Sequence, residues 1–340
     1  MNDLSLPVSV SDTAIPIIDI SGLRRGDTAE SENVARQLGQ ACRDVGFFYV
    51  SDHGVPQSVI DNTFSQAEQF FALPLQEKMN YSLERYSKCF RGYSPPLSEL
   101  ADGKRNSYEL MEFSVEFSED HPDVIAKKPM HGPNQWPSLP GYRETMTTYI
   151  KELTNLGFDL MKGIALSLEL PPDYFHKAFH GRSFWQFRTA HYPESSYIHD
   201  VAKQLPNRGK VDEIEIGDHN CGAHTDYGCL TILLANNPGL QVLSRDGLWF
   251  EAPVIPGAYI CNIGDMLQYW TKDLYKATKH RVISTGSRIS LPFFFQPDYE
   301  TIVEPLPNIP SRDGKVYPSL KYGPYAFKNY QIIYPNSQRS

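Results

Sequence analysis

The chain has 340 residues, 21% of them charged, and a formal net charge of −8. A chain of this length can bury a large core in one domain or two, and its negative charge argues against nucleic-acid or anionic-membrane partners. It has no apolar run of about 18 residues and no basic segment followed by an apolar stretch at the N-terminus, so we expect neither a membrane-spanning helix nor a secretory signal.

The first half of the chain is predicted to be mostly helical. Apolar residues recur at helical spacing over residues 34–45 and, after Pro56, over residues 60–71. Residues 47–50 between them are typical of a strand. A third helix is expected at about 143–168, with one apolar stripe. A helix of this length usually supports a sheet, so we assign it a structural role.

The second half changes to short strand-like runs separated by turns. The predicted strands are residues 184–192, 230–234, 240–243, 249–252, 258–263, 282–283 and 289–295. Many short strands with regular turns indicate a sandwich or barrel. Residues 194–222 are polar and rich in Pro, Asn and Gly, which predicts a long loop. Because this stretch leads into His224, we expect it to border the functional site as a lid.

The motif His224-Thr-Asp226, with His280 further along the chain, predicts a metal site. Residues i and i+2 of a strand point to the same side, so His224 and Asp226 can converge on one ion. Two imidazoles and one carboxylate leave open positions for substrate and dioxygen, which is the ligand set of non-haem Fe(II) oxygenases. His121-Pro-Asp123 has the same spacing, but it lies in a polar, proline-interrupted segment that we expect to be loop.

A second motif, Arg288-Ile-Ser290, predicts a carboxylate-binding site. Alternation places Arg288, Ser290 and Phe294 on one face of a strand, and Arg is suited to bidentate carboxylate binding. The alternative is a surface Arg on an exposed strand face. The apolar residues 291–295 favour burial of the segment on at least one side.

These motifs resemble the isopenicillin N synthase-like branch of the Fe(II)- and 2-oxoglutarate-dependent dioxygenases, over about residues 14–330. The segments that carry the resemblance are His224-Thr-Asp226-Tyr-Gly228, Asn262-Ile-Gly-Asp265, His280-Arg-Val282, Arg288-Ile-Ser290, Ile15-Pro-Ile-Ile-Asp19, Gly46-Phe-Phe-Tyr-Val-Ser-Asp-His-Gly54 and Arg91-Gly-Tyr93. The resemblance implies a mainly β fold with flanking helices and a double-stranded β-helix (distorted jelly roll) core. It also implies an N-terminal region at 1–120 and an oxygenase core at 121–340, together in one compact unit.

The resemblance further implies cofactors and site residues. Fe(II) is expected on His224, Asp226 and His280, with O2 and 2-oxoglutarate as co-substrates. The co-substrate's far carboxylate is expected to meet Arg288, Ser290 and Tyr192, and Asn262 and Asp265 either support the metal ligands or act as turn residues. Oxidative decarboxylation of 2-oxoglutarate is then coupled to hydroxylation, desaturation or cyclisation at a C–H bond.

The substrate is expected to be a small molecule of natural-product or amino-acid type. From the regions that form the substrate pocket in the family, we take Arg91, Tyr93 and Phe294 as candidate contacts. Tyr93 and Phe294 suit an apolar or aromatic group, and Arg91 suits a carboxylate. The alternative for Arg91 is a surface ion pair.

Two other functions stay open at this stage. The segments Asp120-His-Pro-Asp123, Trp136-Pro137 and Asp298-Tyr299 resemble isopenicillin N synthase itself. That enzyme type closes rings in a peptide or amino acid without 2-oxoglutarate, and its Arg and Ser bind the substrate. A jelly roll can also serve a non-catalytic binding protein. The five scattered cysteines, without a Cys-x-x-Cys pair, predict reduced thiols in a cytoplasmic protein and no zinc-thiolate site.

Overall fold

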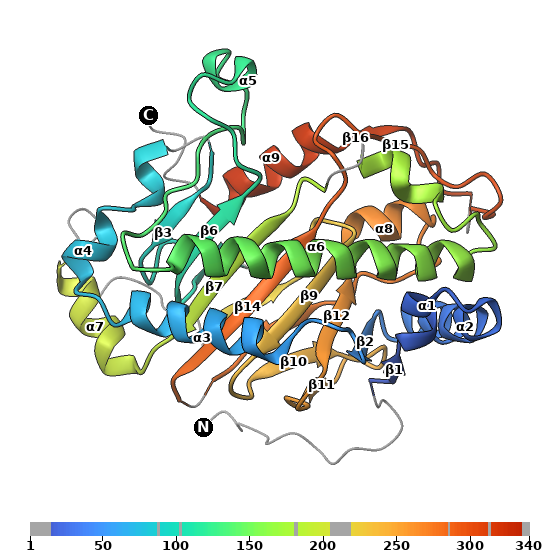
Figure 1. Ribbon diagram of the computed structural model, residues 1–340, viewed down its shortest axis with the longest axis horizontal. Coiled ribbons are helices and arrows are strands. Elements are labelled where there is room, and N and C mark those ends of the chain that lie inside the picture. The colour runs from blue at the N-terminus through green and yellow to red at the C-terminus, as the bar shows by residue number, and fades with distance from the viewer. Residues whose placement is uncertain are drawn as a thin grey trace.

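Two β-sheets form the centre of the computed structural model, which describes residues 15–86, 89–101, 104–179, 183–204, 219–284, 286–311 and 314–334 (Figure 1). The large sheet has the strand order β1-β2-β12-β9-β14-β7-β6-β3. Its strands are β1 (Ile17–Asp19), β2 (Phe47–Ser51), β3 (Gly92–Ser94), β6 (Glu109–Ser114), β7 (Gln186–Tyr192), β9 (Leu230–Ala235), β12 (Tyr259–Ile263) and β14 (Arg288–Phe295). Every pair in this sheet is antiparallel except β1 with β2.

The small sheet has the order β11-β10-β13-β8 and is antiparallel throughout. It consists of β8 (Cys221–His224), β10 (Leu240–Leu243), β11 (Trp249–Glu251) and β13 (His280–Val282). Two short hairpin-like pairs complete the strands, namely β4 (Leu100–Ala101) with β5 (Lys104–Arg105), and β15 (Ile302–Val303) with β16 (Leu320–Lys321). The predicted mainly β jelly-roll fold with flanking helices is thereby confirmed.

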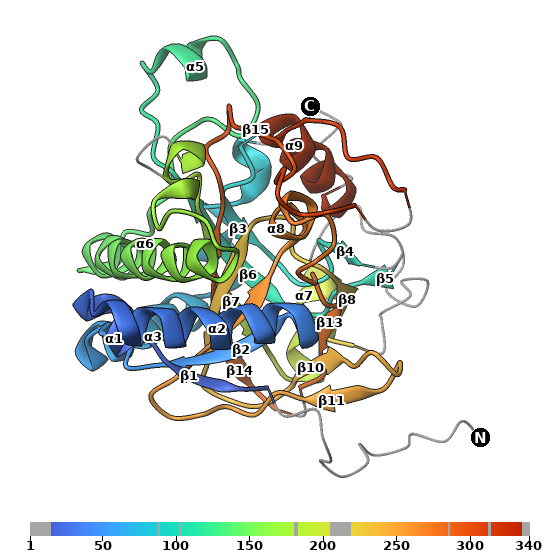
Figure 2. The ribbon, with the colours of Figure 1, turned by 90° about the vertical axis from the view of Figure 1, so that its right-hand side faces the viewer.

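The helices lie on both sides of the sheets (Figure 2). They are α1 (Ser21–Arg25), α2 (Thr28–Asp44), α3 (Gln57–Phe71), α4 (Leu75–Met79), α5 (Pro122–Ile125), α6 (Tyr142–Ser167), α7 (Ser195–Gln204), α8 (Asp265–Trp270) and α9 (Tyr322–Ile333), with short 3-10 turns at Leu83–Tyr86 and Tyr174–Phe179. The long α6 runs along one face of the large sheet beside α2 and α3, as Figure 1 shows. None of the helices in the described ranges is long and apolar enough to cross a lipid bilayer.

Close packing of α6 on the sheet depends on a glycine. A Cβ atom at Gly157 would lie 2.4 Å from the Phe295 ring of β14, so a side chain there would push the helix away. The apolar stripe of α6, including Met146, Leu153 and Leu160, is fully buried in the same core. The structural role predicted for this helix is therefore confirmed.

Two local predictions need correction. The stretch 194–222 is not all loop, because Ser195–Gln204 forms α7. Its residues Ile198, Val201 and Ala202 fall on one side of the helix and are buried. Residues 205–218 of the predicted lid lie outside the described residues, and its last two residues, Cys221 and Gly222, begin β8. The His121 motif is not loop either: it starts the one-turn helix α5, where the His121 ring nitrogen accepts a hydrogen bond from the Asp123 amide.

The large sheet contains strands from both predicted regions of the chain. Strands β1, β2, β3 and β6 precede residue 121, whereas β7, β9, β12 and β14 follow it. The two sets meet where β2 pairs with β12 and where β6 pairs with β7. Side chains of the N-terminal strands therefore reach the same interior as those of the C-terminal strands.

Candidate active site

Three ligand-type side chains converge at one end of the small sheet. His224 ends β8 and pairs directly across the sheet with His280, which begins β13. Asp226 follows in the turn that carries the chain from β8 to β9. Its Oδ1 lies 3.6 Å from the Nε2 atoms of both histidines. The three ligand atoms lie within 4.8 Å of one another, and no other group of three such side chains occurs in the described ranges.

Backbone carbonyls orient both imidazole rings. Nδ1 of His224 lies 2.8 Å from the Gly222 carbonyl oxygen, and Nδ1 of His280 lies 3.1 Å from that of Thr278. Since a carbonyl only accepts, each Nδ1 carries the proton when the ring is neutral. The lone pair then lies on Nε2, which faces Asp226. This is the arrangement expected of two metal-ligating histidines.

Asp226 is held through one of its two oxygens. Oδ2 accepts hydrogen bonds from Thr231 Oγ1 at 2.5 Å and from Asn262 Nδ2 at 2.7 Å, which leaves Oδ1 for a metal. The Asp265 amide at the start of α8 donates to the Asp226 carbonyl at 2.7 Å. Close approach at this point requires Gly264, where a Cβ would lie 2.3 Å from the Gly228 carbonyl oxygen. The Asn262-Ile-Gly-Asp265 motif thus both forms the turn and positions Asp226.

The electrostatics of the three residues suit a divalent cation. Burial opposes a charge on His224, but the Cys221 sulfur and Asp226 outweigh it and raise the pKa of His224 to about 10. Burial lowers the pKa of His280 to about 4, against the pull of Asp226. Burial likewise opposes the Asp226 charge, but the two histidines hold the pKa of that carboxyl below its usual value. A divalent cation at this point would bind both Nε2 atoms and Oδ1, and this donor set fits Fe(II).

The predicted carboxylate site is buried on the large sheet. Arg288 pairs with Tyr192 of β7 in the sheet register, and its guanidinium carbon lies 4.8 Å from the centre of the Tyr192 ring. Arg288 Nε donates to the Asn237 carbonyl at 3.0 Å, whereas its Nη1 has no hydrogen-bond partner among the described residues. Ser290, two residues along the same strand, is also buried. A buried guanidinium with a free N–H group fits a carboxylate ligand.

A cavity of about 180 Å³ opens beside the metal-ligand cluster. His224 and Asp226 line it, and so does Phe294, which lies on the same face of β14 as Arg288 and Ser290 by strand alternation. Arg91 and Tyr93 do not line it. Arg91 is fully buried and donates to the Met130 carbonyl at 2.9 Å, so it is not the surface ion pair considered as the alternative.

Tyr93 lies on the opposite side of the sheet from the cavity. Its hydroxyl donates to Glu109 Oε2 at 2.5 Å, in a buried cluster with Lys78 and Tyr197. Of the three predicted substrate contacts, the structure thus places only Phe294 at the cavity wall.

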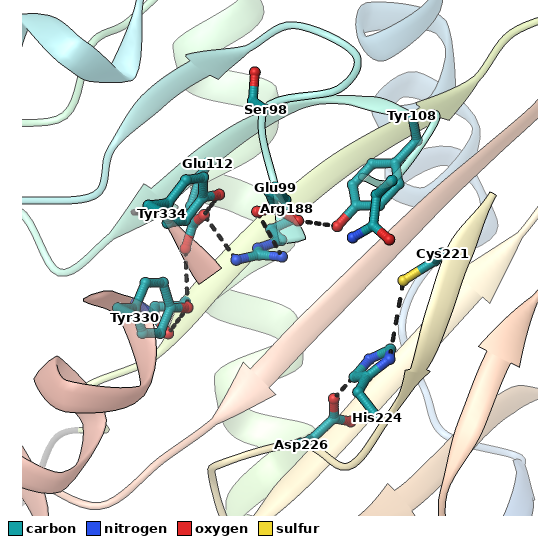
Figure 3. Close-up of polar contacts among 12 residues, drawn as sticks. Ser98, Glu99, Tyr108, Glu112, Arg188, Cys221, His224, Asp226, Tyr330 and Tyr334 are labelled. Atoms are coloured by element: carbon teal, nitrogen blue, oxygen red, sulfur yellow. Dashed lines mark hydrogen bonds and ion pairs between the residues drawn. The ribbon is translucent and has the colours of Figure 1, made fainter. Parts of the chain in front are cut away.

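The cavity also contains charged residues that the sequence motifs did not reveal (Figure 3). Glu99 and Arg188 line it, and Glu112 forms an ion pair with Arg188. Arg188 Nη2 lies 3.1 Å from Glu112 Oε2, and Nη1 lies 3.4 Å from Glu99 Oε1. One signal could have indicated two of them, because Glu112 lies between the apolar Met111 and Phe113 of a strand and Arg188 follows Phe187 in another.

Two family models match the chain. Residues 15–139 match the N-terminal region described as that of non-haem dioxygenases in morphine synthesis, and residues 191–297 match the 2OG-Fe(II) oxygenase superfamily. The second match includes the three ligand-type residues and Arg288. The first ends beyond the predicted boundary at residue 120.

Individual proteins agree with the family models. The chain is 38% identical to a probable iron/ascorbate oxidoreductase of Dictyostelium discoideum, over 88% of this chain and 86% of that protein. It is 36% identical to a homoarginine-6-hydroxylase of Glycine max, over 86% of this chain and 88% of that protein. The solved structure of a full-length Neurospora crassa protein in complex with alpha-KG and thymine matches with a TM-score of 0.76 and 25% identity, over 93% of this chain and 96% of that one.

Proposed function

The chain belongs to the 2OG-Fe(II) oxygenase superfamily, and on that premise we propose that it oxidises a C–H bond of an amino-acid-type small molecule in the cavity beside His224 and Asp226. The observation that carries this proposal is the convergence of His224, Asp226 and His280, with both histidine Nε2 atoms turned toward Asp226 Oδ1. The amino-acid class is supported by the similarity to homoarginine-6-hydroxylases of three plants.

Each residue has a distinct part in the proposed reaction. His224, Asp226 and His280 would hold Fe(II), and Thr231 and Asn262 would keep Asp226 Oδ1 turned toward it. When bound, ferrous iron would activate O2, which is the oxidant, and 2-oxoglutarate would supply two electrons as it is oxidised to succinate and CO2. The protein contributes geometry and a site from which bulk water is excluded.

The carboxylate end of the co-substrate is assigned to Arg288, Ser290 and Tyr192. Arg288 is 1% exposed, and burial lowers its pKa, so an anionic partner would offset the cost of keeping its charge inside the protein. Phe294 would pack against the substrate. All five cysteines are free, which supports the proposal that the enzyme works in a reducing compartment such as the cytoplasm.

Succinate release tests the proposal directly. Protein loaded with ferrous iron is given 2-oxoglutarate, O2 and a panel of amino acids, and succinate is measured. We expect release that requires both iron and 2-oxoglutarate, and a loss of more than about 100-fold in His280→Ala. His199→Ala, an exposed histidine of α7, is the matched control. Substrate oxidation without 2-oxoglutarate would contradict the proposal and favour the ring-closing oxidase instead.

A further inference from the structure

Glu99 reaches the cavity because a short strand crosses over β8. Glu99 immediately precedes β4, and a Cβ at Gly222 of β8 would lie 2.8 Å from the Ala101 Cβ of β4. The absence of a side chain at Gly222 therefore lets β4 lie close over the strand that ends in His224. Figure 3 shows Glu99, Tyr108 and Arg188 on one side of the site and His224 with Asp226 on the other.

One oxygen of Glu99 lacks a hydrogen bond. Glu99 is 4% exposed, and its Oε2 accepts a hydrogen bond from the Tyr108 hydroxyl. Its Oε1 lies 3.4 Å from Arg188 Nη1 without hydrogen-bond geometry and has no hydrogen-bond donor within the described part of the chain. The Tyr334 hydroxyl lies near both carboxylates: it donates to Glu112 Oε2 at 3.2 Å, and burial together with the charge and hydrogen bonding of Glu99 raises the pKa of Tyr334. A buried carboxylate oxygen without a donor is costly, and a ligand that donates to it would remove that cost.

Negative charge is in excess around Arg188. The guanidinium faces two buried carboxylates, those of Glu99 and Glu112. Glu112 is also hydrogen-bonded by the hydroxyls of Tyr330 and Tyr334, at 3.0 and 3.2 Å. Burial raises the pKa of Glu112, and Glu99 adds to the rise against the opposing charge of Arg188. Among the described residues, Arg188 is thus shared by two carboxylates, of which only Glu99 lines the cavity.

We propose that Glu99 determines substrate specificity by binding the cationic side-chain group, an ammonium or guanidinium, of a basic amino-acid substrate. This inference rests on the proposed function, because it names the substrate class of the same cavity. A cation beside Glu99 would donate to Oε1 and would balance the second carboxylate near Arg188. An anionic group has no such place, since Arg188 already faces two carboxylates.

The other walls of the cavity suit the same kind of ligand. Aromatic and aliphatic side chains line the cavity together with Glu99, namely Tyr108, Tyr227, Tyr330, Phe294, Leu100 and Ile332. Aromatic faces attract cations, and aliphatic side chains pack against a methylene chain. A long basic amino acid could therefore place its cationic end at Glu99 and a methylene group toward the metal-ligand cluster.

The test compares charged substrates with uncharged analogues of similar shape. The iron-loaded holoenzyme is assayed for succinate release with L-homoarginine, L-arginine and L-lysine, and with homocitrulline, citrulline and norleucine as the uncharged counterparts. In wild-type protein we expect stimulation by at least one cationic compound and not by its counterpart. Glu99→Gln should lower kcat/KM for that compound roughly 10- to 100-fold and leave the KM for 2-oxoglutarate unchanged. Glu68→Gln, an exposed carboxylate of α3, is the control.

Thermal unfolding and 2-oxoglutarate binding are measured on Glu99→Gln as the controls that the variant folds. Equal stimulation by charged and uncharged compounds, stimulation by none of the cationic ones, or unchanged discrimination in Glu99→Gln would overturn the inference and leave the oxygenase function standing. A wild-type protein that binds neither Fe(II) nor 2-oxoglutarate and releases no succinate would overturn the proposed function, and the inference with it.

Discussion

Two clusters of buried charges lie on the same pair of strands but on opposite faces of the large sheet. Glu109 pairs with His191 across β6 and β7, and three residues along the strand Glu112 pairs with Arg188. Since side chains alternate along a strand, residues three apart point to opposite faces. The Glu109 cluster lies on the side of the sheet where α4 contributes Lys78, and the Glu112 cluster faces the cavity on the other side.

The Glu109 cluster is saturated with hydrogen bonds. Glu109 accepts from Lys78 at 2.8 Å, from Tyr93 at 2.5 Å and from His191 at 2.8 Å. Lys78 Nζ donates in addition to the Phe71 carbonyl and the Tyr197 hydroxyl, so its three N–H groups have partners. Lys78 and Glu109 are both fully buried. Through these hydrogen bonds the cluster connects α4, α7 and the sheet, and it leaves no hydrogen-bonding capacity for a ligand.

The Glu112 cluster differs because its hydrogen bonding is incomplete. Both Glu99 Oε1 and Arg188 Nε lack a hydrogen-bond partner in the described ranges, and both residues border the cavity. Buried polar groups are normally satisfied, so an exception at a cavity wall indicates a ligand site. Burial of a charge therefore does not distinguish a structural cluster from a functional one, whereas unused hydrogen-bonding capacity in the cluster does.

Removing the cation of the saturated cluster should have the largest effect on stability. In Lys78→Met, Glu109 stays buried without its counter-charge, and we expect a loss of about 3–5 kcal/mol in the free energy of unfolding. The double variant Lys78→Met/Glu109→Gln should recover part of the loss. Urea unfolding measures both, with Lys151→Met, an exposed lysine of α6, as the control. A loss below about 1 kcal/mol would remove the distinction between the clusters.

The two carboxyls of β6 should respond to pH with opposite signs. Burial opposes the charge on Glu109, but His191 and Lys78 outweigh it and hold its pKa below the usual 4.5. The ionised Glu109 carboxylate therefore contributes to the free energy of unfolding above its unfolded-state pKa of 4.5. This contribution is lost as the pH falls through the lower pKa that Glu109 has in the folded protein. Burial raises the pKa of Glu112. Its contribution is present below about 4.5 and is lost as the pH rises through the raised value.

Unfolding of wild type, Glu109→Gln and Glu112→Gln between about pH 3.5 and pH 8 measures these signs. We expect the advantage of wild type over Glu109→Gln to shrink at acid pH. Relative to Glu112→Gln, wild type should lose stability as the pH rises. The same sign for both carboxyls would show that the clusters do not differ electrostatically.

Neutralising Glu99 should have the smallest effect on stability. Glu99→Gln keeps an acceptor for Tyr108 and leaves Arg188 with Glu112 as its counter-charge. We therefore expect a change in the free energy of unfolding within about 1 kcal/mol, although the variant loses its discrimination between substrates. A loss above about 2 kcal/mol in urea unfolding would mean that Glu99 is structural, as Glu109 is.

The metal-ligand cluster and most strands could be predicted from the sequence because their signals are local. His224 and Asp226 are two residues apart at a strand end, and only His280 comes from a distant part of the sequence. Arg288 could be placed on one face with Phe294 by alternation alone. The helix α6 follows from a single apolar stripe, and its contact with Phe295 explains the glycine within that stripe.

The substrate side of the cavity could not be predicted in the same way. Glu99, Glu112 and Arg188 come from three separate segments, and α9 adds Tyr330 from near the C-terminus, so only the tertiary fold brings them together. The prediction of Tyr93 as a substrate contact rests on the region that forms the pocket in the resembled family and on an aromatic ring that suits an apolar group. Its residue type does not reveal which face of the sheet it occupies, and Glu109 holds it on the other one.

A crystal structure of the protein grown anaerobically with Fe(II) and 2-oxoglutarate would show whether His224, Asp226 and His280 hold the metal. We predict the metal on Nε2 of His224, Nε2 of His280 and Oδ1 of Asp226, with the far carboxylate of 2-oxoglutarate on Arg288 and the Glu99 side of the cavity left for substrate. A metal bound elsewhere, or a co-substrate carboxylate held by Arg188, would contradict the account.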